Sequence, residues 1–325
     1  YYAMDRDKRW DRVALAYDAI VAGKSEQSFT DPISAIEASY AAKLTDEFMK
    51  PQVAKGYKGF KDGDAVIFFN FRADRARQLS RAITQTEFSE FKRSRYVSLS
   101  GFVCLTPYDV SLKLPAAYEK PKVPATLGEV ISKLGWSQLR IAETEKYAHV
   151  TYFFNGGDEH VFSGEKRVLI PSPRDIPTYD LKPEMSAKAL TDELMKELNG
   201  GDYGFVVVNF ANPDMVGHTG NLNAAIKAVE TVDHCVGRIV QWVEKNGGFM
   251  ILTADHGNCE MMQDANGMPM TAHTLLPVPF IVIDGTQQYA VKDGGRLCDI
   301  APTMLELWNL PKPSEMTGKS LLKAV

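Results

Sequence analysis

The sequence is poor in cysteine, in basic runs and in long apolar segments, and each shortage excludes a class of protein. Its four cysteines among 325 residues are scattered without Cys-x-x-Cys spacing, which argues against a disulfide framework and favours the cytoplasm. The net charge is −4 and no long basic run occurs, so no nucleic-acid partner is expected. No apolar stretch approaches the ~18–20 residues needed to cross a bilayer, so no membrane partner is expected.

The length and composition are those of a globular protein with more than one core. A hydrophobic content of 45% and a charged content of 24% are ordinary for such proteins, and 325 residues favour two domains. Prolines crowd the stretch 105–123, which we interpret as an inter-domain connection. We therefore expect one domain over residues 1–121 and another over residues 122–325.

Strand and helix signals alternate along both parts of the chain. The first part predicts a helix over 7–21, a fully buried strand over 65–71 and another strand over 96–105. The second part predicts strands over 205–210, 249–253 and 278–283, and a long helix over 221–245. Such alternation favours an α/β fold with a doubly wound, mostly parallel sheet and helices on both faces.

Three short segments carry residues that bind metals, namely NPDMVGHTG (212–220), ADHGN (254–258) and AHT (272–274). The first follows one predicted strand and the second follows another, so both belong to the edge where ligands bind in open α/β sheets. One helical turn, capped by Asn212, places Asp214 and His218 on the same face. Asp255 and His256 can reach one ion or two, and His273 adds a further imidazole.

Mixed carboxylate and imidazole ligands suit Mn²⁺, Zn²⁺ or Fe²⁺. The alternative for these five residues is ordinary turn chemistry, which their grouping in three loops at one edge disfavours. His160 and His234 are interpreted as ordinary polar residues.

These three segments resemble the metal-binding segments of the alkaline phosphatase superfamily. Three further motifs, YYAMDRD, FFNFRADRARQL and ETEKYAHVTYFFNGG, make the whole chain similar to the cofactor-independent (2,3-bisphosphoglycerate-independent) phosphoglycerate mutases. The resemblance implies a glycolytic isomerase that interconverts 3-phosphoglycerate and 2-phosphoglycerate through a phosphoserine. It also implies two Mn²⁺ ions, a smaller transferase-like domain over 1–121, a phosphatase-like domain over 122–325, and a monomer whose partner is its phosphoglycerate substrate.

The resemblance also assigns roles to individual residues. Asp214, His218 and His273 correspond to the ligands of one Mn²⁺, and Asp255 and His256 to half the ligands of the other. Lys146 corresponds to a catalytic lysine that contacts the transferring phosphoryl group. The residues that correspond to substrate-binding arginines are Arg6, Arg72 and Arg75. Arg72 and Arg75, three positions apart, are expected to aim at one anion.

Two parts of the family pattern are not found in this sequence. No serine stands in the Asn-Ser-Glu context of the nucleophile, and no Asp-Gly metal motif precedes the transferase-like region. The chain therefore resembles the C-terminal portion of a mutase, with both domains incomplete at their N-terminal sides. We expect it to be inactive alone and to expose a sheet edge and apolar faces.

Two other classes of function remain open from the sequence. One is a different enzyme of the superfamily, either a phosphopentomutase or a metal-dependent phosphatase, although neither explains AMDRD and FFNFRADR together. The other is a non-catalytic metal-binding fragment. A product assay separates the enzymes, because a phosphatase releases inorganic phosphate.

Overall fold

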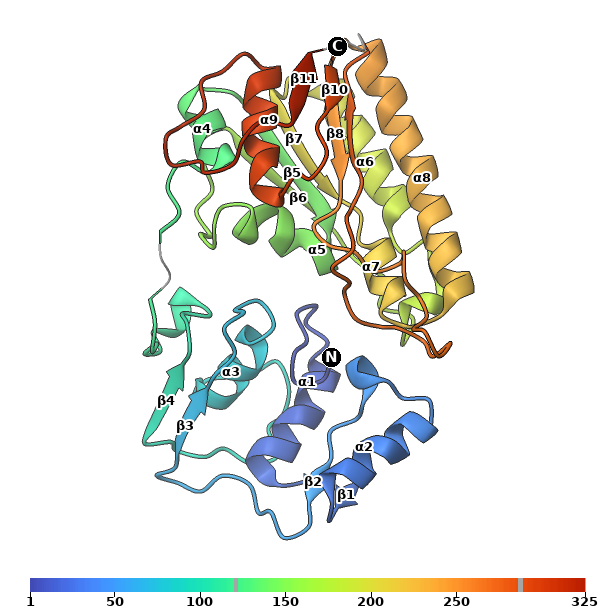
Figure 1. Ribbon diagram of the computed structural model, residues 1–325. Coiled ribbons are helices and arrows are strands. Elements are labelled where there is room, and N and C mark those ends of the chain that lie inside the picture. Colours follow the sequence, from blue (N-terminus) through green and yellow to red (C-terminus); the bar gives the residue numbers. More distant parts are fainter. Residues whose placement is uncertain (120–121, 286–288, 325) are drawn as a thin grey trace. The chain divides into compact units, whose positions relative to one another are not determined.

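The computed structural model describes residues 1–119, 122–285 and 289–324, and the chain divides into two compact units (Figure 1). Unit 1 spans Tyr1–Pro121 and unit 2 spans Lys122–Val325. Residues 120 and 121, where the expected domain boundary falls, lie outside the described residues. Among the described helices, none is both long and apolar enough to cross a lipid bilayer.

Unit 1 combines short helices with two small parallel sheets, β1–β2 and β3–β4. The first helix begins at Trp10, three residues later than expected; after Tyr17 it continues as a π-helical turn and ends at Gly23, whose φ of 64° is left-handed. Val13 and Tyr17 are buried on this helix, which contacts α3. The elements are α1 (Trp10–Tyr17), β1 (Ser28–Phe29), α2 (Pro32–Ala41), β2 (Val53–Ala54), β3 (Ala65–Phe68), α3 (Arg77–Thr84) and β4 (Gly101–Cys104).

The expectation of a fully buried strand over 65–71 is wrong. The strand ends at Phe68, and the side chains along this stretch alternate between partly buried and exposed. Ile67, Phe69 and Phe71 are 72%, 76% and 79% exposed. The reason is that β3 pairs with β4 in a two-stranded sheet and the described chain covers only one of its faces, so apolar side chains on the other face are exposed.

The proline-rich stretch is also more ordered than an inter-domain connection. The backbone N–H of Cys104 donates to the carbonyl of Pro115, and the N–H of Ala117 donates to the carbonyl of Cys104. Tyr108 is 2% exposed, and its hydroxyl donates to the carbonyl oxygen of Phe68. Residues 105–118 therefore pack on the β3–β4 sheet of unit 1, and the expected connection was too long.

Unit 2 is built around a parallel three-stranded sheet in the order β6–β5–β7. Its strands are β5 (Gln138–Glu143), β6 (Glu165–Ile170) and β7 (Phe205–Asn209). Its helices are α4 (Leu127–Lys133), α5 (Thr144–Ala148), α6 (Ala187–Gly200), α7 (Asn212–Gly217), α8 (Leu222–Lys245) and α9 (Ile300–Leu307). Parallel pairing and alternation with helices confirm the α/β class.

Two apolar cores lie on opposite faces of this sheet (Figure 1). On one face, Leu139 and Ile141 of β5 pack with Leu190 and Leu194 of α6, and with Ile239 and Val243 of α8. On the other face, Phe205 of β7 packs with residues of α4 and α9. Burial of these side chains stabilises the sheet at about 25 cal/mol per Å² of apolar surface.

The last strands depart from the parallel pattern. β8 (Met250–Thr253) and β9 (Phe280–Ile283) are antiparallel, with Thr253 opposite Phe280. A second antiparallel pair joins β10 (Tyr289–Val291) to β11 (Leu322–Ala324). The expectation of parallel strands was wrong here, because the connection between β8 and β9 carries no helix in the described chain and does not cross the sheet.

Candidate metal centre

Three chain segments meet near the carboxyl ends of β7 and β8. α7 begins three residues after β7, and Asp255 follows two residues after β8. Because β9 is antiparallel to β8, the loop that precedes β9 returns to the edge where β8 ends. An isolated antiparallel bridge between Gly257 and Thr274 joins the second and third segments directly. This return explains how His273 reaches the site.

Asp214, His218 and His273 form the centre of the site. His218 Nε2 lies 3.1 Å and His273 Nε2 lies 3.0 Å from Asp214 Oδ1, and the two imidazole nitrogens are 3.2 Å apart. These residues were predicted as one ligand set, and the structure brings them together. Among the described residues, these three side chains form a group whose ligand atoms lie close enough together to bind one cation.

The spacing of the three atoms fits a divalent cation. Metal–ligand distances of about 2.1 Å place neighbouring ligands about 3.0 Å apart in an octahedron and about 3.4 Å apart in a tetrahedron. The observed 3.0–3.2 Å are close to one face of an octahedron. One carboxylate and two imidazoles are a donor set suited to Mn²⁺, Zn²⁺ or Fe²⁺.

The orientation of His218 leaves one ring nitrogen available to a metal. Its Nδ1 lies 2.5 Å from the carbonyl oxygen of Thr271. A carbonyl oxygen only accepts hydrogen bonds, so Nδ1 donates its proton to Thr271, and Nε2 is the nitrogen that faces Asp214 and would bind a metal once it carries no proton. Metal-ligating histidines are commonly held by such a bond from the second nitrogen.

The local structure of α7 explains why Asp214 and His218 share a face. The helix starts at Asn212 with Pro213 in its first turn, and the N–H of His218 donates to the carbonyl of Asp214. Asn212 is not the N-cap that the sequence predicted, because Ala211 takes that place. The Asn212 side chain is instead buried and donates to the carbonyl of Pro183.

Lys146 is the fourth group in contact with the centre. It lies on α5, which directly follows β5, and its Nζ is 2.5 Å from Asp214 Oδ2. Burial disfavours the charge of Asp214, but hydrogen bonds from His218 and His273 and the charge of Lys146 outweigh burial. The pKa of Asp214 is therefore held well below its ordinary value.

Asp255 and His256 lie beside this centre and outside the cluster of three. The ring of His256 stacks on the ring of His273, with centroids 3.6 Å apart. His256 Nε2 is 3.7 Å from Asp255 Oδ2, so the two side chains face each other. Burial is the main cause that lowers the pKa of His256.

The predicted arginines lie in unit 1, where Asp74 binds two of them. Arg6 Nη1 is 3.0 Å and Arg72 Nε is 2.8 Å from the buried carboxylate of Asp74. Arg75 donates to the carbonyl of Met4 and lies over the ring of Tyr1. Arg72 and Arg75 therefore contact different groups in the structure, and the expectation that both aim at one anion stays a prediction.

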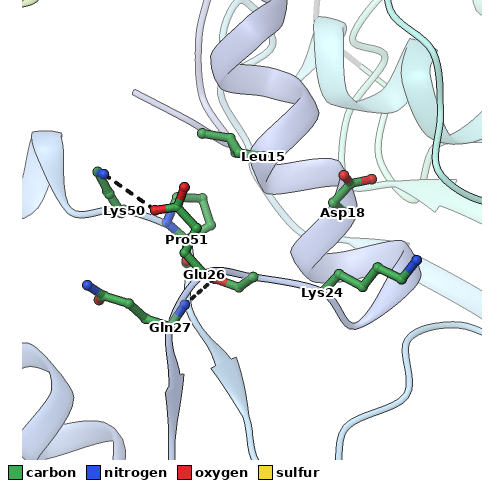
Figure 2. A pocket seen from close by; sticks show the side chains of 8 residues that line it. Leu15, Asp18, Lys24, Glu26, Gln27, Lys50 and Pro51 are labelled. Carbon is green, nitrogen blue, oxygen red and sulfur yellow. Dashed lines mark hydrogen bonds and ion pairs between the residues drawn. The ribbon is translucent and has the colours of Figure 1, made fainter.

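A cavity of about 340 Å³ in unit 1 shares no residue with either cluster (Figure 2). It lies between the end of the first helix and the segment before β2, and an ion pair between Lys50 and Glu26 spans part of its rim. Its lining combines aliphatic stems with charges of both signs and converges on no single group. The titratable clusters, and not this cavity, therefore define the functional site.

Sequence reasoning missed several residues that hold the predicted ligands in place. Asn258 donates to Asp214, while Glu260 accepts from the hydroxyl of Thr274, next to His273. A Cβ atom on Gly257 would clash with the side-chain oxygens of Glu260 and Thr274, so a larger residue there would displace this hydrogen-bonded pair. Gly257 and Asn258 both belong to the motif TADHGN (253–258), but the motif alone does not indicate which loops Asn258 connects.

Comparisons with known proteins agree with these motifs. The profile of the metalloenzyme superfamily matches residues 22–312. A 2,3-bisphosphoglycerate-independent phosphoglycerate mutase of Syntrophotalea carbinolica is 55% identical over 325 residues, which are 99% of this chain and 63% of the relative. The corresponding protein of Lawsonia intracellularis is 52% identical, and the match covers 100% of this chain and 64% of the relative.

A solved structure extends the similarity to the fold. Phosphoglycerate mutase of Leishmania mexicana, crystallised at low cobalt concentration, superposes with a TM-score of 0.89 and 31% identity, over 100% of this chain and 64% of that one. The chain spans about 63% of the length of the curated relative from Syntrophotalea carbinolica. The chain belongs to the metalloenzyme superfamily, and within it the chain resembles the 2,3-bisphosphoglycerate-independent phosphoglycerate mutases.

Proposed function

We propose that this chain carries part of the active site of a phosphoglycerate mutase that interconverts 3-phosphoglycerate and 2-phosphoglycerate in glycolysis and gluconeogenesis. The observation that supports it best is the cluster of Asp214, His218 and His273, with Lys146 in contact with it. Unit 2 would be the phosphatase-like domain, of the alkaline phosphatase type, and unit 1 the transferase-like domain. We also propose a cytoplasmic monomer.

The metal centre would hold Mn²⁺ through Asp214, His218 and His273. A bound divalent cation neutralises phosphate charge and orients the reacting oxygens. Asp255 and His256 would supply half the ligands of a second site, and their position beside His273 supports this role. Support for a metal site also comes from the Leishmania mexicana relative, whose crystals were studied at low cobalt concentration.

The cationic side chains would bind the substrate. Phosphoryl transfer mainly requires groups to be positioned and charge to be neutralised. Lys146 offers a compact charge that contacts the phosphoryl group, whereas Arg6, Arg72 and Arg75 offer planar donors for carboxylate or phosphate oxygens. Asp74 would orient Arg6 and Arg72 for that task, since it binds both.

The nucleophilic serine and one aspartate ligand would come from residues that this chain does not contain. The isolated chain is therefore expected to bind Mn²⁺ without catalysing turnover. Incubation of the purified chain with 3-phosphoglycerate and Mn²⁺, followed by a coupled assay for 2-phosphoglycerate, tests this. Turnover would contradict the inactivity of the chain, and release of inorganic phosphate would favour a phosphatase.

A chimera tests the parent activity. The chain would be joined to the N-terminal segment of the Syntrophotalea carbinolica relative that it does not cover. Mutase activity that depends on Mn²⁺ and is lost in Lys146→Ala is the expected result. A well-folded chimera that binds metal but converts neither phosphoglycerate would instead support a non-catalytic metal-binding fragment.

A further inference from the structure

We propose that Asn258 is the positioning residue for the carboxylate of Asp214, and that Gly217 is required to make room for its side chain. The inference rests on the proposed function, because the metal centre is part of that proposal. It assigns to the last residue of the TADHGN motif a task distinct from metal binding.

The side-chain amide of Asn258 holds Asp214 at two points. Its Nδ2 is 2.9 Å from Asp214 Oδ1 and 3.1 Å from the main-chain carbonyl oxygen of Asp214. One donor therefore links the carboxylate to the backbone that carries it, which restricts rotation about both side-chain torsions. The carboxylate oxygen that it contacts is the same one that lies against His218 and His273.

A fixed partner is needed because the helix that carries Asp214 is short. α7 has six residues, and isolated helices of that length are unstable without tertiary contacts. Asn258 is 5% exposed, so water does not compete for its amide. A buried donor of this kind sets the direction of the carboxylate before a cation arrives.

Asn258 also connects Asp214 to the loop that carries the third ligand. Its backbone N–H donates to Glu260 Oε2 at 2.6 Å, and the other oxygen of Glu260 accepts from the hydroxyl of Thr274. Thr274 follows His273 in sequence. The path from Asp214 through Asn258 and Glu260 therefore joins all three predicted metal-binding segments.

Gly217 explains why this amide fits against α7. A Cβ atom at Gly217 would lie 2.2 Å from Asn258 Oδ1, 2.7 Å from its Cγ and 3.1 Å from its Nδ2. The φ of Gly217 lies outside the left-handed range, so its backbone would accept alanine. The steric conflict is thus with Asn258, because its amide atoms are the three nearest neighbours.

The test measures the Kd for Mn²⁺ by isothermal titration in four forms of the full chain. These are the unchanged chain, Asn258→Ala, Gly217→Ala and the double variant. We expect Asn258→Ala to weaken binding about 10–100-fold, as loss of a residue that orients a metal ligand typically does. Gly217→Ala should weaken binding in the unchanged background and add nothing in the Asn258→Ala background, where the conflicting atoms are gone.

Cys259→Ala is the matched control. Cys259 is the next residue, and its Sγ donates to the carbonyl of Pro213 on the same helix. This hydrogen bond goes to the backbone of α7 and not to the carboxylate of Asp214, so the Kd for Mn²⁺ should stay within twofold. Circular dichroism of each metal-free variant measures whether the fold is retained.

Each remaining outcome counts against the inference. A Kd within twofold in Asn258→Ala shows that Asp214 needs no such partner. If the two substitutions raise the Kd for Mn²⁺ independently, so that the double variant shows the product of the two effects, Gly217 acts through another neighbour. Loss of helical signal in metal-free Asn258→Ala shows a structural role instead. Absence of Mn²⁺ binding in the unchanged chain, by contrast, overturns the proposed metal centre and this role with it.

Discussion

Lys146 and Asp214 form an ion pair that joins α5 to α7, with Nζ 2.5 Å from Oδ2 and side chains only 3% and 12% exposed. The two residues are 68 positions apart, beyond the ends of neighbouring strands β5 and β7. Pairs this deeply buried are strongly coupled, because removal of one charge leaves the other without compensation. The pair connects the proposed phosphoryl-binding lysine to the proposed metal ligand.

Substitution of Lys146 by methionine tests this coupling. We expect Lys146→Met to lower the free energy of unfolding of the metal-free chain by about 3 kcal/mol, because Asp214 keeps a buried charge without its lysine partner. Urea unfolding of unit 2 gives the value. Lys188→Met, at an exposed position on α6, is the control and should change it by less than about 0.5 kcal/mol. Equal midpoints for both variants would contradict the coupling.

Substitution of His218 tests the metal centre itself. His218→Ala removes one of three clustered ligands, so we expect the Kd for Mn²⁺ to rise about 100-fold or more, while the fold is retained. Titration calorimetry gives the affinity and circular dichroism the fold. His234→Ala, on the exposed side of α8, is the control. An unchanged Mn²⁺ affinity in His218→Ala would remove this residue from the site.

Acid unfolding tests the arginine cluster of unit 1. Burial opposes the charge of Asp74, but Arg72 and Arg6 outweigh it and lower its pKa from 3.8 to about 2. Since the folded-state pKa is the lower one, this carboxylate stabilises the fold above about pH 4, and the contribution is lost as the pH falls towards 2. The shift corresponds to about 2 kcal/mol.

We therefore expect Asp74→Asn to be about 2 kcal/mol less stable than the unchanged chain at pH 6 and equally stable near pH 2. Urea unfolding at several pH values measures the difference. Asp233→Asn, on an exposed part of α8, should follow the unchanged chain throughout. A difference that persists at low pH would show that Asp74 acts by packing rather than by charge.

The exposed apolar side chains on β3 and just after it, Ile67, Phe69 and Phe71, predict an effect on solubility rather than on stability. Phe69 is 76% exposed, so we expect Phe69→Ser to change the free energy of unfolding by less than about 0.5 kcal/mol and to reduce self-association. Phe102 on β4 is 6% exposed, and Phe102→Ala should lower the free energy of unfolding by about 3–5 kcal/mol. Light scattering and urea unfolding separate the two effects, and a large loss of stability in Phe69→Ser would contradict the exposure of this face.

The grouping of the proposed metal ligands was predictable because their signals are local. Asp214 and His218 stand four residues apart behind a strand and a proline, and the helix predicted over 221–245 follows as Leu222–Lys245 with Asn221 as its N-cap. The sequence predicted that His273 joins the site, but it did not predict the chain path that brings His273 there. The sequence did not indicate that β9 runs antiparallel to β8, although this direction is what brings His273 to the edge.

The partners of each side chain were not predictable from the sequence. Arg72 and Arg75 have helical spacing, but Arg72 contacts a buried carboxylate and Arg75 donates to a backbone carbonyl. The apolar run at β3 is typical of a strand covered on both faces, and the exposure of Phe69 depends on which strands lie beside it. Such tertiary contacts are not encoded in local periodicity.

The antiparallel pairing of β8 with β9 has a consequence for a chain clipped by a protease. The segment between them starts and finishes at neighbouring positions, Thr253 and Phe280, and its outermost turn around Gly267 is exposed. A single cut at that turn would leave both new ends attached to paired strands. The paired strands would then keep Asp255 on one piece and His273 on the other at the same edge of the sheet. An intact backbone at this turn is therefore not required to hold the two loops together.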